Sequence, residues 1–293
     1  MRKAMKLYRM EEKAVFKIGE GETSEVFSIG GGKVVKLIKK DMYDVNEFES
    51  EYKIAKFMGE TADFTPKVFD KVYLDSRHGY TMEEISGSLF QDVIDKNPEN
   101  FSHYAKHFGS AHRKLHNKKI SQELESLSYV NEFMREFLNR NQSLPTEINT
   151  WLKELLEEIP NKISLLHGDF MPYNIMCQDE NLIVIDWAEP SIGSSLHDVA
   201  RTINFIVDTT SFPKSIMTKN STAFVKAYLE GYYPDGKVEK DLLHKSFLIN
   251  AASEIAWAER SGQWDAYSEY LKQLIIENFE SNQSIYIDSF KHF

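Results

Sequence analysis

Four polar side chains in the middle of the chain have types and spacing suited to chemistry: His167, Asp169, Asn174 and Asp186. Asn and Asp side chains offer hard oxygen ligands of the kind that Mg²⁺ binds, usually alongside phosphate oxygens. Asp169 lies five positions before Asn174, close enough to share a site while its carboxylate accepts a proton. The set therefore indicates a magnesium site with a neighbouring base.

A predicted β-hairpin positions these residues. Two short apolar runs, 175–177 and 182–185, flank a polar turn at 178–181, which is typical of a hairpin. The polar residues lie just before the first strand and just after the second, so they converge at one end of the ribbon. The apolar residues that precede them are predicted to be buried: Ile163, Leu165 and Leu166. A hairpin with solvated polar ends is the alternative interpretation.

Composition indicates a folded, acidic protein. The chain has 293 residues, 42% hydrophobic and 13% aromatic, enough for a sizeable core in one large domain or two lobes. The formal net charge of −10 argues against a nucleic-acid surface and suits a cationic substrate. The single cysteine, Cys177, excludes an internal disulfide and fits a reducing compartment. Without a signal peptide or a membrane-spanning apolar stretch, we expect a soluble cytoplasmic protein with no membrane partner.

The N-terminal part carries the pattern of an antiparallel meander, with strand-like runs at 14–18, 26–29 and 33–38 separated by glycine-containing turns. The first turn reads Gly-x-Gly-x-x-Ser-x-Val, which allows close approach of the backbone to a phosphate; an ordinary hairpin turn is the alternative. Period-two alternation places Lys36 on the same strand face as Val34. This favours Lys36 over the neighbouring lysines as a functional residue, the alternative being a solvent-facing edge lysine.

A helix is predicted from Asn46, a suitable N-cap, to Gly59, a suitable C′ residue. Glu51 falls on the apolar stripe of this helix, whereas Glu49 falls on its polar side. A carboxylate on a core-facing stripe needs a partner because unpaired burial is costly, and Lys36 is the natural one, by similarity to the Lys–Glu pair of kinases. A half-exposed Glu51 at the edge of the stripe is the alternative.

The rest of the chain is predicted to be mostly helical, after strands at 66–69, 71–74 and 79–82 and a polar connection at 83–87. His112 lies beside an apolar helical stripe and is predicted to be a packed core histidine. Asp198 lies in the first turns of another helix, where an acidic residue also complements the helix dipole. One helix is predicted to start at Asn97-Pro98. Further helices are predicted at 123–140, 147–158, 196–207, 214–230, 239–260 and 263–280.

The order and spacing of these motifs resemble the aminoglycoside phosphotransferase and choline kinase family, kinase-like enzymes that phosphorylate small molecules. The resemblance rests on the His-Gly-Asp run that ends at Asp169, with Asn174 five positions on, and on the Ile-Asp-Trp run around Asp186. Protein kinases have His-Arg-Asp and Asp-Phe-Gly at the corresponding places.

The resemblance implies an α+β, protein-kinase-like fold with two lobes. The small antiparallel-sheet N-lobe would cover 1–82, a hinge linker 83–87, and the larger helical C-lobe, with the catalytic loop and the acceptor pocket, 88–293. Nucleotide and magnesium would lie in the cleft between the lobes. Asp198 would brace the catalytic loop.

The resemblance also implies a role for each candidate site residue. Asp169 would orient the acceptor hydroxyl and accept its proton, and Asn174 and Asp186 would hold Mg²⁺. Lys36, held by Glu51, would steady the α- and β-phosphates of ATP. The other residues that the resemblance assigns to the nucleotide are Gly21, Thr23, Ser24, Val26, Val34, Met82, Glu83 and Ile85.

We therefore predict an ATP- and Mg-dependent phosphotransferase that moves the γ-phosphoryl group to a hydroxyl of a small molecule, with a cationic acceptor such as an aminoglycoside or an amino alcohol favoured. A protein kinase is one alternative, although the chain has no Ala-Pro-Glu and little room for an activation loop after Trp187. A non-catalytic nucleotide-binding module is the other, against which Asp169 counts. The acceptor and the choice of ATP over GTP stay open.

The last two predicted helices carry acidic and aromatic residues that suit a cationic acceptor through charge and cation–π contact. A solvated helix face with buried tryptophans explains the same residues equally well. They are Glu254, Trp257, Glu259, Trp264, Asp265 and Glu269.

Overall fold

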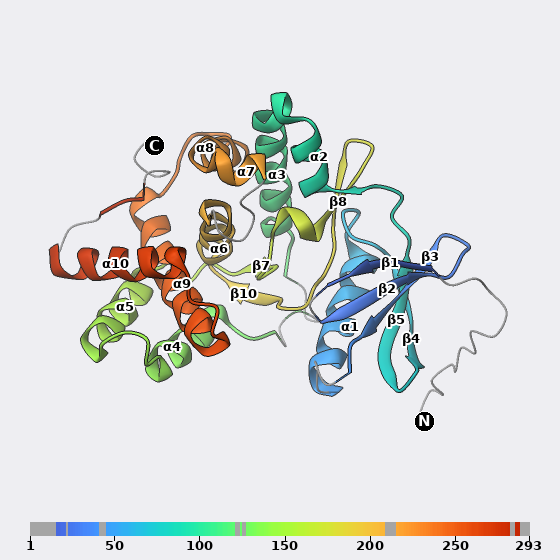
Figure 1. The fold of residues 1–293 in the computed structure, drawn as a ribbon, viewed down its shortest axis with the longest axis horizontal. Helices are drawn as coiled ribbons and strands as arrows, with labels where there is room; N and C mark the ends of the chain where they lie inside the picture. The colour runs from blue at the N-terminus through green and yellow to red at the C-terminus, as the bar shows by residue number, and fades with distance from the viewer. Residues whose placement is uncertain are drawn as a thin grey trace. The chain divides into compact units, whose positions relative to one another are not determined.

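Figure 1 shows a computed structural model that describes residues 16–21, 23–40, 45–120, 124, 127–208, 215–281 and 285–287. The chain forms two compact units. Unit 1 comprises Met1–Phe90 and Asn174–Glu189, and unit 2 comprises Gln91–Tyr173 and Pro190–Phe293. The hairpin that carries Asp186 therefore groups with the N-terminal part of the chain. The roles predicted for the two lobes stay predictions.

Unit 1 is built on a five-stranded antiparallel sheet with the order β1-β2-β3-β5-β4. Helix α1 (Val45–Thr61) packs against β4 and β5 of this sheet (Figure 1). The predicted meander is confirmed, and the two runs predicted at 66–69 and 71–74 form one strand with an irregularity between Val68 and Lys71. The strands are β1 Phe16–Glu20, β2 Ser24–Ser28, β3 Lys33–Ile38, β4 Val68–Leu74 and β5 Arg77–Glu83.

The register of this sheet gathers residues of the predicted site on one face. Val26 of β2 lies opposite Lys36 of β3, and on the other side of β3, Val34 lies opposite Met82 and Lys36 opposite Tyr80. Directly paired residues of antiparallel strands share a face. The opposite face carries an apolar cluster of Val35, Leu37 and Val72, packed against Phe27, Ile29 and Leu74.

The predicted hairpin is confirmed as strands β8 (Ile175–Gln178) and β9 (Asn181–Val184). A short strand that the sequence did not indicate, β6 (Ser88–Leu89), pairs with β8. Gly87 is needed before β6, because a Cβ there would lie 2.2 Å from the carbonyl oxygen of Cys177.

In the described part of unit 2, the elements are helices apart from the short strand pair β7 (Ser164–Leu166) and β10 (Ser191–Gly193). Its most extensive helix packing joins α3 with α8 and α6 with α9. Helix α2 runs across the boundary of the two units. The helices are α2 Phe90–Lys96, α3 Phe101–His116, α4 Val130–Arg140, α5 Thr146–Glu158, α6 Ser195–Val207, α7 Ile216–Lys219, α8 Ser221–Tyr232, α9 Lys240–Ser261 and α10 Ala266–Ser281. Single turns of 3₁₀ helix occupy Pro98–Asn100 and Pro172–Asn174.

Several predicted boundaries were wrong. Asn46 and Gly59 lie inside α1 and do not cap it. The segment predicted as one helix at 214–230 contains two, α7 and α8, which meet at Asn220. Ile163, predicted to be buried, is 51% exposed.

Other boundaries shifted or fell on residues without a description. Helix α4 begins at Val130 and α10 at Ala266, later than predicted. The predicted first strand starts at 14, and positions 14–15, like Glu22 of the glycine turn, lie outside the described residues. In the ranges given above, no helix combines the length and the apolar composition needed to cross a bilayer.

Candidate active site

Lys36 and Glu51 form a buried ion pair, as the position of Glu51 on the helical stripe predicted. Lys36 Nζ donates to Glu51 Oε1 at 2.7 Å, and the two residues are 4% and 1% exposed. The half-exposed alternative for Glu51 is therefore wrong. Glu49, the rejected candidate, is exposed and pairs with Lys71. The role of Lys36 and Glu51 in nucleotide binding stays a prediction.

Tyr80 also contacts this ion pair, a contact that the sequence did not indicate. Its hydroxyl donates to the same Glu51 Oε1 at 2.8 Å, and its ring centroid lies 6.0 Å from Lys36 Nζ. Among the described residues, Glu51 Oε2 has no hydrogen-bond partner. Tyr80 is two positions before Met82 on the same strand face, a spacing that could have indicated it.

Lys36 also reaches the metal candidate Asp186, donating to its Oδ1 at 2.8 Å. Burial by itself would lower the pKa of the Lys36 ammonium. The neighbouring groups of Tyr80, Asp186 and Glu51 outweigh burial and raise that pKa well above its usual value. Lys36 is therefore a permanent cation between two carboxylates.

The backbone around Asp186 is held in an uncommon conformation. Asp186 has a φ of 63°, a left-handed value that non-glycine residues adopt only where the surroundings enforce it. The N–H of Ile185 donates to the carbonyl of Asn174 at 2.9 Å, which brings Asn174 beside Asp186. The buried indole of Trp187 donates to Thr65 Oγ1 at 3.0 Å. These two bonds fix the residues on either side of Asp186.

The described part of the glycine turn is closed by main-chain bonds. The N–H of Gly21 donates to the carbonyl of Ser24 at 2.9 Å, and the N–H of Lys39 donates to the carbonyl of Thr23 at 2.8 Å. Ser24 is only 4% exposed. At the predicted linker, the N–H of Glu83 donates to the carbonyl of Lys67 at 2.8 Å. The contacts of these residues and of Ile85 with a nucleotide stay predictions.

The predicted catalytic loop lies in unit 2 and follows β7. Gly168 has a φ of +81°, which explains a glycine between His167 and Asp169. The N–H of Asp169 donates to His167 Nδ1 at 3.3 Å, so His167 shapes the loop. The hydroxyl of Tyr173 donates at 3.3 Å to each carboxylate oxygen of Asp169, a contact that the sequence did not indicate.

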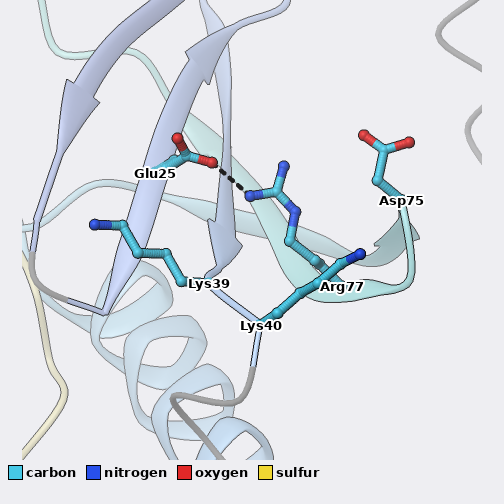
Figure 2. A pocket seen from close by; sticks show the side chains of 5 residues that line it. All are labelled: Glu25, Lys39, Lys40, Asp75 and Arg77. Atoms are coloured by element: carbon cyan, nitrogen blue, oxygen red, sulfur yellow. Dashed lines mark hydrogen bonds and ion pairs between the residues drawn. The ribbon is translucent and has the colours of Figure 1, made fainter.

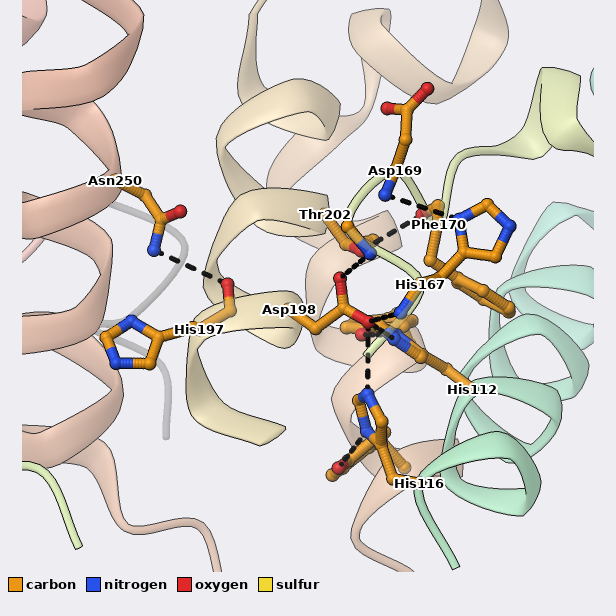
Figure 3. Close-up of polar contacts among 12 residues, drawn as sticks. His112, His116, His167, Asp169, Phe170, His197, Asp198, Thr202 and Asn250 are labelled. Carbon is orange, nitrogen blue, oxygen red and sulfur yellow. Dashed lines mark hydrogen bonds and ion pairs between the residues drawn. The ribbon is translucent and has the colours of Figure 1, made fainter. Parts of the chain in front are cut away.

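Asp198 of α6 holds this loop, as the sequence led us to expect (Figure 3). Its Oδ2 accepts the N–H of His167 at 2.7 Å, and its Oδ1 accepts the N–H of Gly168 at 3.1 Å. Burial acts to raise the pKa of the Asp198 carboxyl, but hydrogen bonds from His112 and His116 outweigh it and hold that pKa well below its usual range. Asp198 is therefore an anion under the loop.

His112 is buried, as predicted, and it also contacts Asp198. Its Nε2 lies 3.2 Å from Asp198 Oδ2. Burial and the neighbouring His116 lower the pKa of His112 to about 3. The contact therefore joins a neutral imidazole to a carboxylate.

A shallow pocket in unit 1 contains none of the predicted site residues (Figure 2). Its lining is entirely charged: Glu25, Lys39, Lys40, Asp75 and Arg77. Arg77 pairs with Glu25, and Lys39 pairs with Glu20. Glu25 precedes Val26 in β2, so its side chain points to the sheet face opposite Lys36. We interpret this pocket as a cluster of paired surface charges.

Trp257 and Trp264 are not buried, so the buried tryptophans of the alternative interpretation are wrong. Trp257 of α9 is 47% exposed, and Trp264, just before α10, is 37% exposed. Lys272 Nζ lies 5.4 Å from the Trp264 ring centroid. Asp265 accepts hydrogen bonds from the N–H and the hydroxyl of Ser268, which makes it a cap of α10.

Comparison with known proteins agrees with this geometry. The phosphotransferase enzyme family matches residues 16–241, most of the chain. No curated protein sequence matches the chain. A choline/ethanolamine kinase family protein from Mesorhizobium loti has a similar structure, with a TM-score of 0.61 and 16% identity over 91% of this chain and 88% of that chain.

Two further solved structures share the fold. Amicoumacin kinase hAmiN has a TM-score of 0.66 and 11% identity over 95% of this chain and 91% of that chain. Wild-type aminoglycoside 2'-phosphotransferase-IIIa has a TM-score of 0.60 and 13% identity over 92% of this chain and 94% of that chain. The predicted α+β, protein-kinase-like fold is thereby confirmed. Because the family match spans most of the chain, the protein belongs to the phosphotransferase enzyme family.

Proposed function

We propose that this enzyme transfers the γ-phosphoryl group of ATP to a hydroxyl of a small cationic molecule, with Mg²⁺ as the metal. The observation that carries the proposal is the buried Lys36, held at once by Glu51 and Asp186 at 2.7 and 2.8 Å. Kinases hold the phosphate-binding lysine by a glutamate in the same way. Phosphates arriving at this lysine would take over the contact that Asp186 now makes, leaving Asp186 to bind the metal.

Two solved relatives of the fold support a nucleotide substrate. Amicoumacin kinase hAmiN was solved with AMP-PNP and Ca²⁺, and aminoglycoside 2'-phosphotransferase-IIIa was solved with GDP. An adenine nucleotide is our choice for this chain. Met82 lies opposite Val34 in the sheet, and we assign this apolar pair to the adenine ring, with Glu83 and Ile85 at the edge of the base.

The donor set around Asp186 fits magnesium. It combines one carboxylate with the side chain of the adjacent Asn174, and Mg²⁺ is usually bound by one or two such oxygen ligands together with substrate phosphates. When bound, the ion would neutralise charge that develops on the transferring phosphoryl group. We assign both side chains to it.

We assign the acceptor hydroxyl to Asp169. The residue lies five positions before Asn174, and one bifurcated hydrogen bond from the Tyr173 hydroxyl orients its carboxylate. Asp169 would hold the hydroxyl in line with the γ-phosphorus and accept its proton as the new P–O bond forms, while the bond from the γ-phosphorus to the β–γ bridging oxygen breaks and ADP leaves. Positioning and charge neutralisation would supply most of the rate, because the chain itself forms no bond to phosphorus.

A cationic acceptor is supported by the formal net charge of −10 and by two exposed tryptophans, Trp257 of α9 and Trp264 just before α10. Ammonium groups bind well over tryptophan faces. The single Cys177 supports work in a reducing compartment such as the cytoplasm. We assign no nucleic acid as a partner.

The substitution Asp169→Asn tests the assignment of the base. We expect nucleotide binding to persist and transfer to an acceptor to fall by about two to four orders of magnitude, the usual contribution of a general base. Isothermal titration with ATP·Mg and a coupled assay of ADP release measure the two quantities. Asp179→Asn is the matched control, because Asp179 is an exposed residue of the β8–β9 turn. Transfer by Asp169→Asn at the rate of the control would overturn the assignment.

A further inference from the structure

Asp198 accepts more than the two backbone N–H groups of the loop, because one of its oxygens accepts hydrogen bonds from three donors (Figure 3). Asp198 Oδ2 lies 2.7 Å from the N–H nitrogen of His167. It also lies 3.2 Å from Nε2 of His112 and 3.2 Å from Nε2 of His116. Both histidines belong to α3 and are buried. The carboxylate thus accepts hydrogen bonds from the catalytic loop on one side and from two histidines of α3 on the other.

A tyrosine of α8 fixes the far side of each histidine ring. Nδ1 of His112 lies 2.7 Å from the hydroxyl of Tyr228, and Nδ1 of His116 lies 2.7 Å from the hydroxyl of Tyr232. A carboxylate only accepts, so Nε2 of each ring carries the proton and Nδ1 accepts from the tyrosine. Two parallel chains of hydrogen bonds therefore run from α8 through α3 to the carboxylate.

His112 also touches the loop directly. Its ring stacks on Phe170, the residue after Asp169, with centroids 3.9 Å apart and an interplanar angle of 12°. The hydroxyl of Thr202 donates to the carbonyl of Phe170 at 2.9 Å. The backbone before Asp169 is thus held through Asp198, and the residue after it is held by His112 and Thr202.

We propose that His112, oriented by Tyr228, is a positioning residue for phosphoryl transfer, which acts by fixing the backbone on both sides of Asp169. The inference rests on the proposed role of Asp169 as the base. A leucine or phenylalanine at this buried position would carry no polar group of its own to satisfy. A buried histidine is costly to place unless its hydrogen bonds are made. Here one ring nitrogen bonds Tyr228, and the other bonds Asp198, which holds the loop.

The same atoms have the spacing of metal ligands, since His112, His116 and Asp198 offer three within 4.8 Å of one another. A metal at these atoms needs lone pairs on both Nε2 atoms. The hydrogen bonds to Asp198 use the protons of those nitrogens, while the Nδ1 lone pairs are taken by tyrosine hydroxyls. The positioning network therefore accounts for every ring nitrogen of the two histidines without an ion.

Two substitutions of His112 separate positioning from packing. His112→Phe keeps an aromatic ring against Phe170 but removes the N–H donor to Asp198, whereas His112→Gln keeps an N–H donor and loses the ring. We expect His112→Phe to lower kcat about 10- to 100-fold, the effect of a small misplacement of a reacting group, with the KM for ATP within about twofold of wild type. We expect His112→Gln to recover most of kcat. His103→Phe, on the exposed side of α3, is the matched control.

Wild-type kcat in His112→Phe would overturn the proposal. Equal losses in the Phe and Gln variants, with KM raised as well, would also overturn it and indicate packing alone. If His112→Phe does not fold, Tyr228→Phe replaces it, with a smaller loss of kcat expected and the same unchanged KM. Undiminished transfer by Asp169→Asn would contradict the proposed base instead, so the two failures are distinguishable.

Two readouts do not depend on turnover. Nitrogen NMR of the folded protein at pH 7 should show His112 as the Nε2–H tautomer, and elemental analysis should find no stoichiometric transition metal. An Nδ1–H tautomer or one equivalent of bound zinc would contradict the network.

Discussion

At the scale of single residues, Glu51 Oε1 is the acceptor that holds Lys36 in the candidate nucleotide site. It accepts from both Lys36 and Tyr80, and the whole group is buried. Removing one partner of a buried charged pair leaves the other uncompensated, which is costly. Loss of the carboxylate should therefore disturb the phosphate-binding lysine far more than loss of the tyrosine hydroxyl.

We predict graded effects of Glu51→Gln and Tyr80→Phe on kcat/KM for ATP. Glu51→Gln should lower it about 100-fold, equivalent to about 3 kcal/mol, because Lys36 loses the charge that holds it. Tyr80→Phe should lower it several-fold. Tyr52→Phe is the control, since the Tyr52 hydroxyl in the same ring cluster donates only to the Phe69 carbonyl. Equal kcat/KM in wild type and Glu51→Gln would contradict this account.

Much at this scale could be predicted from the sequence, because strand and helix periodicity determine which residues face each other. That reasoning chose Glu51 over Glu49, and the likeness to the kinase Lys–Glu pair gave Lys36 as its partner, which is confirmed. It missed the hydrogen bonds from the hydroxyl of Tyr80 to Glu51 and from that of Tyr173 to Asp169. The partner of a side-chain hydroxyl depends on tertiary contacts that a local sequence pattern does not contain. It identified His112 as a core residue but not its bond to Asp198, which comes from a helix far away in the chain.

At the scale of elements, the closest packing in unit 2 joins α3 and α8, and two glycines permit it. A Cβ on Gly109 would lie 2.0 Å from the carbonyl oxygen of Tyr228, and a Cβ on Gly231 would lie 2.0 Å from that of Lys106. Backbone atoms cannot move aside as a flexible side chain can. The glycines therefore set the distance between the helices that carry His112 and Tyr228.

We predict that Gly109→Ala destabilises the protein, although alanine is the better helix former by about 1 kcal/mol. Overpacking of this kind typically costs about 1–3 kcal/mol, and the separation of the helices should also lower kcat. Urea unfolding measures the first effect and the acceptor assay the second. Ser102→Ala, at an exposed position of α3, should change neither. A stabilised Gly109→Ala variant would show that the helices are not in contact there.

The existence of most helices and strands was predictable from hydrophobic periodicity, but their ends were less so. The start of α7 follows from contacts that a local pattern does not contain. Asp95 accepts from the N–H of Ile216 and from the hydroxyl of Ser215, and Ser215 in turn caps α7 by accepting from Met217. Long-range capping of this kind determines where a helix begins, and the local sequence pattern does not contain it.

At the scale of the whole molecule, burial of three histidines makes folding sensitive to acid. Burial lowers the pKa of His112 to about 3 and the pKa values of His197 and His244 to about 4. In the unfolded chain these groups titrate near 6.5. Between about pH 6.5 and pH 4 the unfolded state therefore binds more protons than the folded state, so acid favours unfolding.

We predict that the free energy of unfolding falls as the pH drops from 7 to 5, with each buried histidine contributing up to about 1.4 kcal/mol per pH unit. Urea unfolding at several pH values measures the slope. His197→Leu should reduce it, because among the described residues neither ring nitrogen of His197 has a hydrogen-bond partner. A free energy that stays constant over this range would show that these histidines are protonated in the folded protein.

The fold class was predictable at this scale because the motifs occur in a fixed order along most of the chain. The grouping of 174–189 with unit 1 was not, since it depends on β6 pairing with β8 and on Trp187 reaching Thr65. These contacts join parts of the chain that local patterns treat separately.

The measurement that tests the central claim most directly is mass spectrometry of the acceptor after incubation with ATP, Mg²⁺ and the enzyme. The acceptors would be aminoglycosides, choline-like amines, amino alcohols and neutral sugars. The account predicts that one cationic class gains a single phosphoryl group, and that this product forms about two to four orders of magnitude more slowly with Asp169→Asn but at the wild-type rate with Asp179→Asn. A phosphorylated product that Asp169→Asn forms as fast as wild type, or phosphorylation of the neutral sugars alone, would contradict it.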